Sequence, residues 1–396
     1  MQKLKVGMKT LSLKLLAVAV VLLSAIACNR GEGPVGTEND EGLMSKRDVA
    51  RMLSSLPLGD GQLYEVYDAV SSSSANGYDE EYMMSDLLNS PGTGVGDRGS
   101  SSTKASSYQT PIRSLIEEYL ASYAASSTKA GGADVQRYLD YLQDSGMQIY
   151  WPYSENWDGS ALPLITFDPG NGAESNYAYV VTSTDNGYEV VDSVFVDENV
   201  AKSRPVWVIN QNDDSDCVPL ETFLGTKSIW DYDDEDEDVE KYNLYIKDFT
   251  MLRNYDSWLA GASEFHVWCG AVNGFYATTE EQLKSYQPEV TDFVVVVKRS
   301  EIGKKKSFRA ILVTDFSDQL DKLAFLIVED DGGTRTNWKC SASVKIKSKT
   351  YGFDIDIPYH SSDDVVWRGQ LGATYFTKGK SIEGRFGDVK ITFALE

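Results

Sequence analysis

The stretch from Asp292 to Val328, DFVVVVKRSEIGKKKSFRAILVTDFSDQLDKLAFLIV, decides the fold class of this chain. It holds three apolar runs, Phe293 to Val297, Ser307 to Asp315 and Lys322 to Val328, with polar turn residues between them. Short runs rich in Val, Ile and Phe that are bounded by turns are typical of β-strands. Strands at this spacing without intervening helices predict a sandwich or barrel. We expect a C-terminal β-sandwich domain over residues 291–396, completed by the runs Cys340 to Lys347, Gly352 to Ile357 and Val389 to Leu395.

Strand signals also extend upstream, over residues 146–290. Asp185-Asn186-Gly187 is a strong hairpin cue, because Asn-Gly suits the positive φ angles of a tight turn. No regular alternation of helix and strand is visible, which argues against a doubly wound fold. We therefore predict a mainly β chain with two β-sandwich-like domains. The first is built from the runs Leu164 to Phe167, Tyr177 to Thr182, Tyr188 to Val196, Pro205 to Asn210, Tyr242 to Met251 and Glu264 to Cys269.

Residues 43–145 have a different character, because they are rich in serine and carry helix signals. Ser45 with Asp48 has the pattern of a capping box, and Thr110-Pro111 places a cap and a proline at the start of a helix. Short amphipathic helices need a surface to pack on. We expect a helical, partly disordered segment that docks on the β domain or on itself. Its best apolar stripe is Ile112, Leu115, Ile116, Tyr119, Leu120 and Tyr123.

The first residues have the layout of a secretory signal. Four lysines precede an apolar run from Leu15 to Ala27 that only Ser24 interrupts, and no acidic residue comes before Cys28. A helix that crosses a bilayer needs about 20 apolar residues, so this run is too short for a permanent span. The segment ends Ala25-Ile26-Ala27-Cys28, which resembles the bacterial lipobox, although the family prefers Leu where Ala25 stands. The alternative is an ordinary secretory signal in which Cys28 is incidental.

The lipobox resemblance implies that residues 1–27 are removed as a lipoprotein signal peptide and that Cys28 is diacylated, with palmitate-type chains. Residues 28–42 are then a flexible tether between the lipid and the folded chain. Asn29 rather than Asp follows Cys28, which by the family rule is compatible with the outer membrane. We therefore expect a lipid-anchored protein of the cell envelope.

Several further stretches look like those of uncharacterised lipoproteins from gut-type Bacteroides relatives. This resemblance supports the compartment and implies no activity and no site residues. The stretches are Gly77-Tyr78-Asp79-Glu80-Glu81-Tyr82, Tyr150-Trp151-Pro152-Tyr153, Pro205-Val206-Trp207-Val208-Ile209-Asn210 and the turn at Glu329.

Composition limits the classes of partner. The chain has 60 acidic and 37 basic residues, a formal net charge of −23, and the signal would take four of the lysines with it. Such a charge repels nucleic acid, which we exclude as a partner. Cys217, Cys269 and Cys340 form no C-x-x-C pair, so they allow one disulfide with one thiol left over, or three small core side chains.

Carboxylates stand at the ends of several predicted strands. If their loops converge, they would resemble the calcium site of C2 domains, since calcium takes six to eight hard oxygen ligands. The alternative is that these are ordinary turns rich in Asp and Gly. The acidic run Asp231 to Glu240 lacks a turn glycine and reads as a solvated loop. The candidate calcium ligands are Asp315, Glu329, Asp330, Asp331, Asp363 and Asp364.

Tryptophans supply the other candidate site. Trp151, Trp157 and Trp258 would form an aromatic surface on which a glycan stacks, with Trp258 beside Gly261 at a turn. The alternative is that these rings belong to the core, where tryptophan is highly buried on average.

No familiar enzyme motif is present. The chain lacks H-E-x-x-H, G-x-S-x-G and a P-loop, and its only two histidines, His266 and His360, have no matching nucleophile motif, so we read both as structural. The leading hypothesis is a non-catalytic, membrane-anchored lipoprotein that binds a glycan or an envelope protein. One alternative is a secreted hydrolase with a carboxylate pair, active for example on glycans. The other is a calcium-dependent β module.

Overall fold

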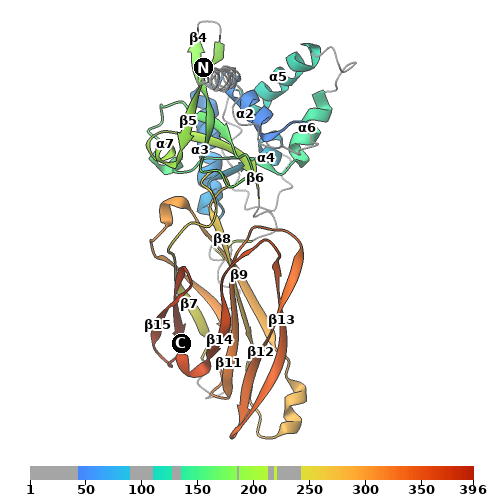
Figure 1. Cartoon of the computed structure of the whole chain (residues 1–396), viewed down its shortest axis with the longest axis vertical. Helices are drawn as coiled ribbons and strands as arrows, with labels where there is room; N and C mark the ends of the chain where they lie inside the picture. The colour runs from blue at the N-terminus through green and yellow to red at the C-terminus, as the bar shows by residue number, and fades with distance from the viewer. Residues whose placement is uncertain (1–42, 90–109, 127–134, 185–186, 213–217, 221–241) are drawn as a thin grey trace, which may run out of the picture. The chain divides into compact units, whose positions relative to one another are not determined.

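The computed structural model describes residues 43–89, 110–126, 135–184, 187–212, 218–220 and 242–396. The chain is mainly β, as predicted, and its strands form three sheets (Figure 1). Cys28, the signal and tether over residues 1–42, Cys217 and the acidic run Asp231 to Glu240 lie outside the described residues. Among the residues described, no helix is both long enough and apolar enough to span a membrane.

The first sheet has six strands in the order β1-β2-β6-β3-β4-β5. Strands β3 and β6 run parallel, and the other neighbours are antiparallel. Its edge strand β1 comes from the segment that we predicted to be helical. The bounds are β1 Glu81–Met83, β2 Met147–Tyr150, β3 Leu164–Phe167, β4 Ser175–Thr184, β5 Gly187–Asp197 and β6 Val206–Gln211.

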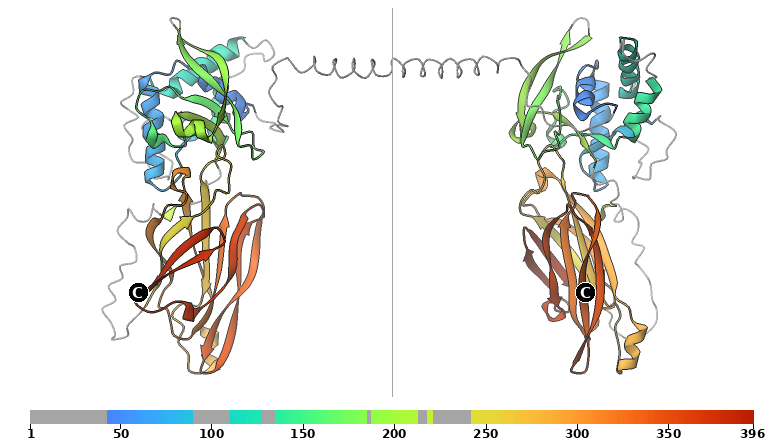
Figure 2. Two further views of the ribbon diagram at one scale, coloured as in Figure 1. Left: turned by 60° about the vertical axis from the view of Figure 1, so that its left-hand side comes forward. Right: turned by 45° about the vertical axis from the view of Figure 1, so that its right-hand side comes forward.

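Helices cover one face of this sheet, as the two views of Figure 2 show in blue and teal beside the green β4–β5 hairpin. The predicted cap is confirmed: Ser45 and Asp48 form a capping box at the start of α2. Four residues of the predicted stripe of α5, Ile112, Leu115, Ile116 and Leu120, are buried in one core with Ile149 and Ile165 of the sheet, so the helical segment docks on the β part. Tyr119 is half-buried and Tyr123 is exposed. The bounds are α2 Lys46–Ser54, α3 Asp60–Ala75, α4 Met84–Leu88, α5 Ile112–Ser126 and α6 Val135–Asp144, while α7 is Glu198–Ser203.

The remaining strands form a β-sandwich. One sheet has the order β10-β7-β16-β15, and the other has the order β13-β12-β11-β8-β9, with β14 paired to β11. Their facing side chains share one core, in which the rings of Phe249 and Phe265 lie 5.2 Å apart and those of Phe325 and Phe393 5.8 Å apart. The bounds are β7 Leu244–Met251, β8 Ser263–Ala271, β9 Glu289–Val297, β10 Lys306–Val313, β11 Leu320–Glu329, β12 Arg335–Ile346, β13 Lys349–His360, β14 Asp364–Gly372, β15 Ser381–Phe386 and β16 Val389–Leu395.

The pairing of strands shows that the sandwich begins earlier in the chain than the domain boundary predicted at residue 290. Strands β7 and β8 belong to the sandwich, and β9 itself crosses residue 290. The preceding sheet is not a second sandwich, because helices rather than strands cover one of its faces. Strand pattern alone does not reveal these differences, since it does not tell which distant strand a given run pairs with.

Candidate functional site

Two turns of the sandwich lie side by side. The turn after β11 and the turn after β13 are joined by hydrogen bonds from the Ser361 N–H to the Thr334 carbonyl (3.0 Å) and from the Thr334 N–H to Ser361 Oγ (3.1 Å). Gly333 has a φ of +100°, and a Cβ there would lie 2.6 Å from Ser362 Oγ. Only glycine fits this backbone at such a close approach. The two turns therefore form a fixed platform for the acidic residues they carry.

Asp330 lies between the only two histidines of the chain. His266 Nε2 is 3.1 Å from Asp330 Oδ2, and His360 Nδ1 is 3.4 Å from Asp330 Oδ1. His360 Nδ1 is also 3.9 Å from Asp363 Oδ1. We call Asp330, Asp363, His266 and His360 the carboxylate–histidine cluster. Three of its four members, Asp330, His360 and Asp363, each offer a ligand atom within 4.8 Å of the others.

The environment of Asp330 favours its ionised form. Burial alone would raise the pKa of this carboxyl group, but hydrogen bonds from His266 and from the Gly332 N–H outweigh burial and hold the pKa well below its usual range. The pKa of Asp363 is instead raised, first by burial and then by the neighbouring charge of Asp330. Two carboxyl groups in such proximity favour having one proton or one cation between them.

A second set of carboxylates adjoins this cluster. Asp256, Glu264 and Glu329 place one oxygen each within 4.8 Å of the others, and the Glu264 and Glu329 side chains are buried. Burial raises the pKa of Asp256, despite a hydrogen bond with Glu329 and the nearby charge of Arg299. Asp331 links the two sets, since burial and then the charges of Asp256, Asp364, Asp363 and Asp330 raise its pKa to about 6.

Five of the six predicted calcium ligands lie in this region. Glu329 pairs directly with Asp364 across β11 and β14, and Asp330, Asp331 and Asp363 occupy the adjoining turns. Asp315 does not join them, because it precedes β11 whereas Glu329 ends it. A strand of ten residues is about 30 Å long. The Asp315 N–H instead donates a hydrogen bond to Asn243 Oδ1 at 2.9 Å.

Sequence reasoning missed four members of this region: Asp256, Glu264, His266 and His360. The available signal was the alternation of Glu264 and His266 along β8, which puts both side chains on one face. Strand β8 pairs with β11 so that His266 stands opposite Val328, two residues before Asp330. That long-range register brings the histidine to the carboxylate.

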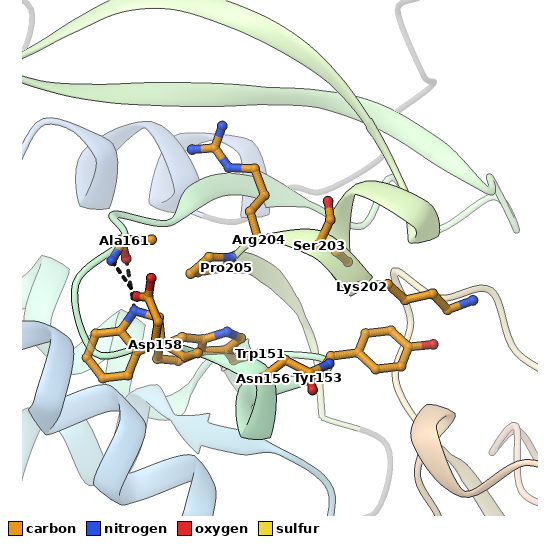
Figure 3. A pocket seen from close by; sticks show the side chains of 11 residues that line it. Trp151, Tyr153, Asn156, Asp158, Ala161, Lys202, Ser203, Arg204 and Pro205 are labelled. Carbon is orange, nitrogen blue, oxygen red and sulfur yellow. Dashed lines mark hydrogen bonds between the residues drawn. The ribbon is translucent and has the colours of Figure 1, made fainter.

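A second candidate site is a pocket of about 130 Å³ in the α/β part, which we call the tryptophan pocket (Figure 3). Trp151 and Trp157 line it, with ring centroids 5.3 Å apart. Pro205 and Arg204 lie on the side opposite to Trp151. Asn156, Asp158, Lys202 and Ser203 add polar groups to the lining. The pocket therefore combines aromatic rings with amide, carboxylate and cationic side chains.

Glu80 holds the loop that carries these tryptophans. Its buried carboxyl group accepts hydrogen bonds from the Tyr153 N–H (3.2 Å), the Ser154 N–H (3.1 Å) and Ser154 Oγ (2.7 Å). The loop needs this support because Tyr153 adopts a left-handed backbone with a φ of 60°. Burial, followed by the charge of Asp79, raises the pKa of Glu80 to about 8.

Hydrogen bonds and an ion pair also fix the lining side chains. Asp158 accepts bonds from the Ser160 and Ala161 N–H groups, and Trp157 Nε1 donates to the Ala161 carbonyl at 3.0 Å. Lys202 lies 3.2 Å from Glu198. The pocket is thus largely preformed, which is usual for ligand sites.

The three predicted stacking tryptophans have different surroundings. Trp258 is fully buried against the first sheet and donates from Nε1 to the Glu174 carbonyl, so the prediction that it forms a binding surface is wrong. Trp151 is almost completely enclosed, in part by the rings of Tyr67 and Trp207. Trp157 is half-buried. Trp151 and Trp157 meet in one small pocket rather than on an open surface.

Cys269 and Cys340 both carry free thiols. Burial raises the pKa of Cys269 far above its usual range and that of Cys340 to about 11. A thiol with a raised pKa is a poor nucleophile, because the thiolate is the reactive form. Their positions fit the interpretation as small core side chains.

Comparison with known proteins assigns no relative. The chain matches no protein-family model and no curated protein sequence.

Proposed function

We propose that this chain is an exported lipoprotein, anchored in the outer membrane through Cys28, whose folded part binds a short glycan in the tryptophan pocket without catalysis. The observation that carries the ligand class is the meeting of Trp151 and Trp157 in a pocket with Asn156 and Asp158. The anchor is inferred from the apolar run and the Ala25-Ile26-Ala27-Cys28 sequence.

The chemistry of the pocket suits a sugar ring. One face of a pyranose exposes C–H groups, which pack on the electron-rich face of an aromatic ring. Its edge exposes hydroxyl groups, which pair with amide and carboxylate side chains that a pocket positions. Asp158 and Asn156 supply such groups beside Trp157. The small volume favours one sugar residue inside, with any others extending into solvent.

The charge around the pocket favours an acidic sugar. Arg204 and Lys202 both line the pocket, in a chain whose net charge is strongly negative. Glu198 already neutralises part of the charge of Lys202. The guanidinium group of Arg204 points away from Trp151 in Figure 3, so Arg204 is the stronger candidate for pairing with the carboxylate of a sugar residue that extends from the pocket.

Binding of defined oligosaccharides to the full chain tests this proposal. Neutral and uronic-acid-containing oligosaccharides are titrated by calorimetry against the wild type, Trp157→Ala and Trp338→Ala. Trp338 is a matched control, because it is also half-buried but lies on β12 in the sandwich. We expect at least one sugar to bind the wild type and Trp338→Ala alike and to bind Trp157→Ala at least tenfold more weakly.

Two results would overturn the proposal. Equal binding by wild type and Trp157→Ala would exclude the pocket. Release of shorter sugars during incubation would identify a hydrolase instead of a binding protein.

A further inference from the structure

The structure assigns a second site, independent of the tryptophan pocket: we propose that Asp330, His360 and Asp363 bind one divalent transition-metal ion of the Zn²⁺ class. Three ligand atoms converge there from two turns of the sandwich. The site differs in chemistry from the calcium site that the sequence predicts, because it contains an imidazole.

The spacing of the ligand atoms fits an ion between them. Zinc binds imidazole nitrogen and carboxylate oxygen at about 2.0–2.2 Å, so two ligands at tetrahedral positions lie about 3.4 Å apart. His360 Nδ1 is 3.4 Å from Asp330 Oδ1 and 3.9 Å from Asp363 Oδ1. A direct charge-assisted hydrogen bond is about 2.7–2.9 Å long, and both separations are longer than that. The imidazole nitrogen therefore sits at ligand spacing from both oxygens.

The ligands are held in place by contacts outside the ion position. His266 Nε2 lies on Oδ2 of Asp330, while Oδ1 accepts the Gly332 N–H at 2.8 Å and also faces His360. Asp363 accepts the backbone N–H of His360 at Oδ2 (2.7 Å), while its Oδ1 accepts the Asp331 N–H (3.4 Å) and faces the imidazole of His360. Such supporting contacts orient metal ligands and typically contribute 10–100-fold to affinity, to order of magnitude.

Charge and access also favour a cation. Asp331 and Asp364 add negative charge beside the ligands, and the buried Glu329 adjoins Asp330 in sequence. The side chain of Asp363 is only 2% exposed, whereas that of His360 is 38% exposed, so an ion reaches the buried oxygens past the imidazole. Three protein ligands leave a fourth position for water or a partner group.

The imidazole decides the class of ion. Calcium and magnesium prefer an all-oxygen shell, whereas imidazole nitrogen suits zinc, copper, nickel and iron. The two histidines of the chain are both in this cluster. We therefore expect the site to bind zinc and cobalt much more tightly than calcium.

The experiment uses the full chain without a histidine tag, stripped of metal with a chelator. ZnCl₂, CoCl₂ and CaCl₂ are titrated separately by calorimetry, and bound metal is counted by mass spectrometry. We expect one Zn²⁺ per chain, at least tenfold weaker binding of Ca²⁺, and a visible Co²⁺ absorption band typical of tetrahedral coordination.

Three variants locate the ion. His360→Gln and Asp363→Asn are expected to bind Zn²⁺ at least tenfold more weakly than wild type, while Asp315→Asn, at the other end of β11, binds within about twofold of it. Asn tolerates the left-handed backbone of Asp315, which has a φ of 48°. If circular dichroism shows that Asp363→Asn does not fold, the proposal is tested by His360→Gln, which changes a half-exposed side chain, and by the Co²⁺ spectrum of the wild type. No Zn²⁺ binding at about 0.1 mM, unchanged binding by His360→Gln, or Ca²⁺ binding as tight as Zn²⁺ would each overturn the assignment.

Discussion

His266 Nε2 lies 3.1 Å from Asp330 Oδ2, and this contact joins β8 to the turn that follows β11. The imidazole ring stacks on Trp268, with ring centroids 5.9 Å apart, so packing as well as hydrogen bonding fixes its orientation. The aspartate in turn accepts the Gly332 N–H at 2.8 Å. One buried carboxylate thereby connects a strand, a turn and, through His360, the neighbouring turn.

Asp330→Asn should destabilise the chain in a pH-dependent way. Its folded-state pKa lies below the unfolded value, so its ionised form contributes stability above about pH 4, and this contribution is lost as the pH falls toward the folded pKa. We expect the free energy of unfolding at pH 7 to fall by about 2 kcal/mol, since both histidines lose a charged partner. Urea unfolding with chelator present measures this. A difference in the free energy of unfolding between variant and wild type that stays constant from pH 7 to pH 3 would contradict the ionic explanation.

Gly333→Ala should cost more stability than Gly332→Ala, although both glycines have positive φ angles. A Cβ at Gly332 meets open space, whereas one at Gly333 lies 2.6 Å from Ser362 Oγ. We expect losses of about 1 kcal/mol for Gly332→Ala and about 3 kcal/mol for Gly333→Ala. Urea unfolding of the two variants gives the comparison. Equal losses would mean that backbone strain alone, without the close approach of the two turns, explains both.

The sequence predicted the acidic region better than it predicted the fold around it. Carboxylates at strand ends placed Glu329, Asp330 and Asp331 together, because these residues adjoin one another along the chain. The same rule failed at Asp315, because the chain reverses between β10 and β11, so that these strands of the two facing sheets end at opposite ends of the sandwich. The prediction that Trp258 lies on a binding surface failed for a related reason. The residues that bury it, including Ala178 and Val208, belong to strands that lie much earlier in the sequence. His266 reaches Asp330 only through the β8–β11 register, which local pattern does not determine.

Cys28→Ser should release the protein from the membrane. If Cys28 carries the lipid, its loss removes an anchor worth roughly 0.8 kcal/mol per buried methylene. We expect the variant to move to the soluble fraction after cell lysis and to lose incorporation of a labelled fatty acid. Cys340→Ser, which alters a half-buried thiol of β12, serves as the control and should stay with the membrane. Continued labelling of Cys28→Ser would show that the anchor is elsewhere.

Glu80 should make the folded chain less stable as the pH rises from about 4.5 to about 8. Its pKa is raised from the ordinary value of 4.5 to about 8 in the folded state, so in this window the folded chain keeps a proton that the unfolded chain has lost. Each step up in pH therefore favours unfolding, and above the folded pKa the penalty is complete.

Glu80→Gln removes this titration while preserving the size of the side chain. Its amide oxygen still accepts from Ser154, but its NH₂ group faces the Tyr153 N–H, which adds a constant cost at every pH. We expect the variant to be less stable than wild type at pH 5 and to recover about 3 kcal/mol relative to it by pH 8. Urea unfolding between pH 5 and pH 8 measures the slope, with the exposed Glu281→Gln as control. Parallel pH profiles for Glu80→Gln and wild type would show that Glu80 is ionised throughout, held by its three donors.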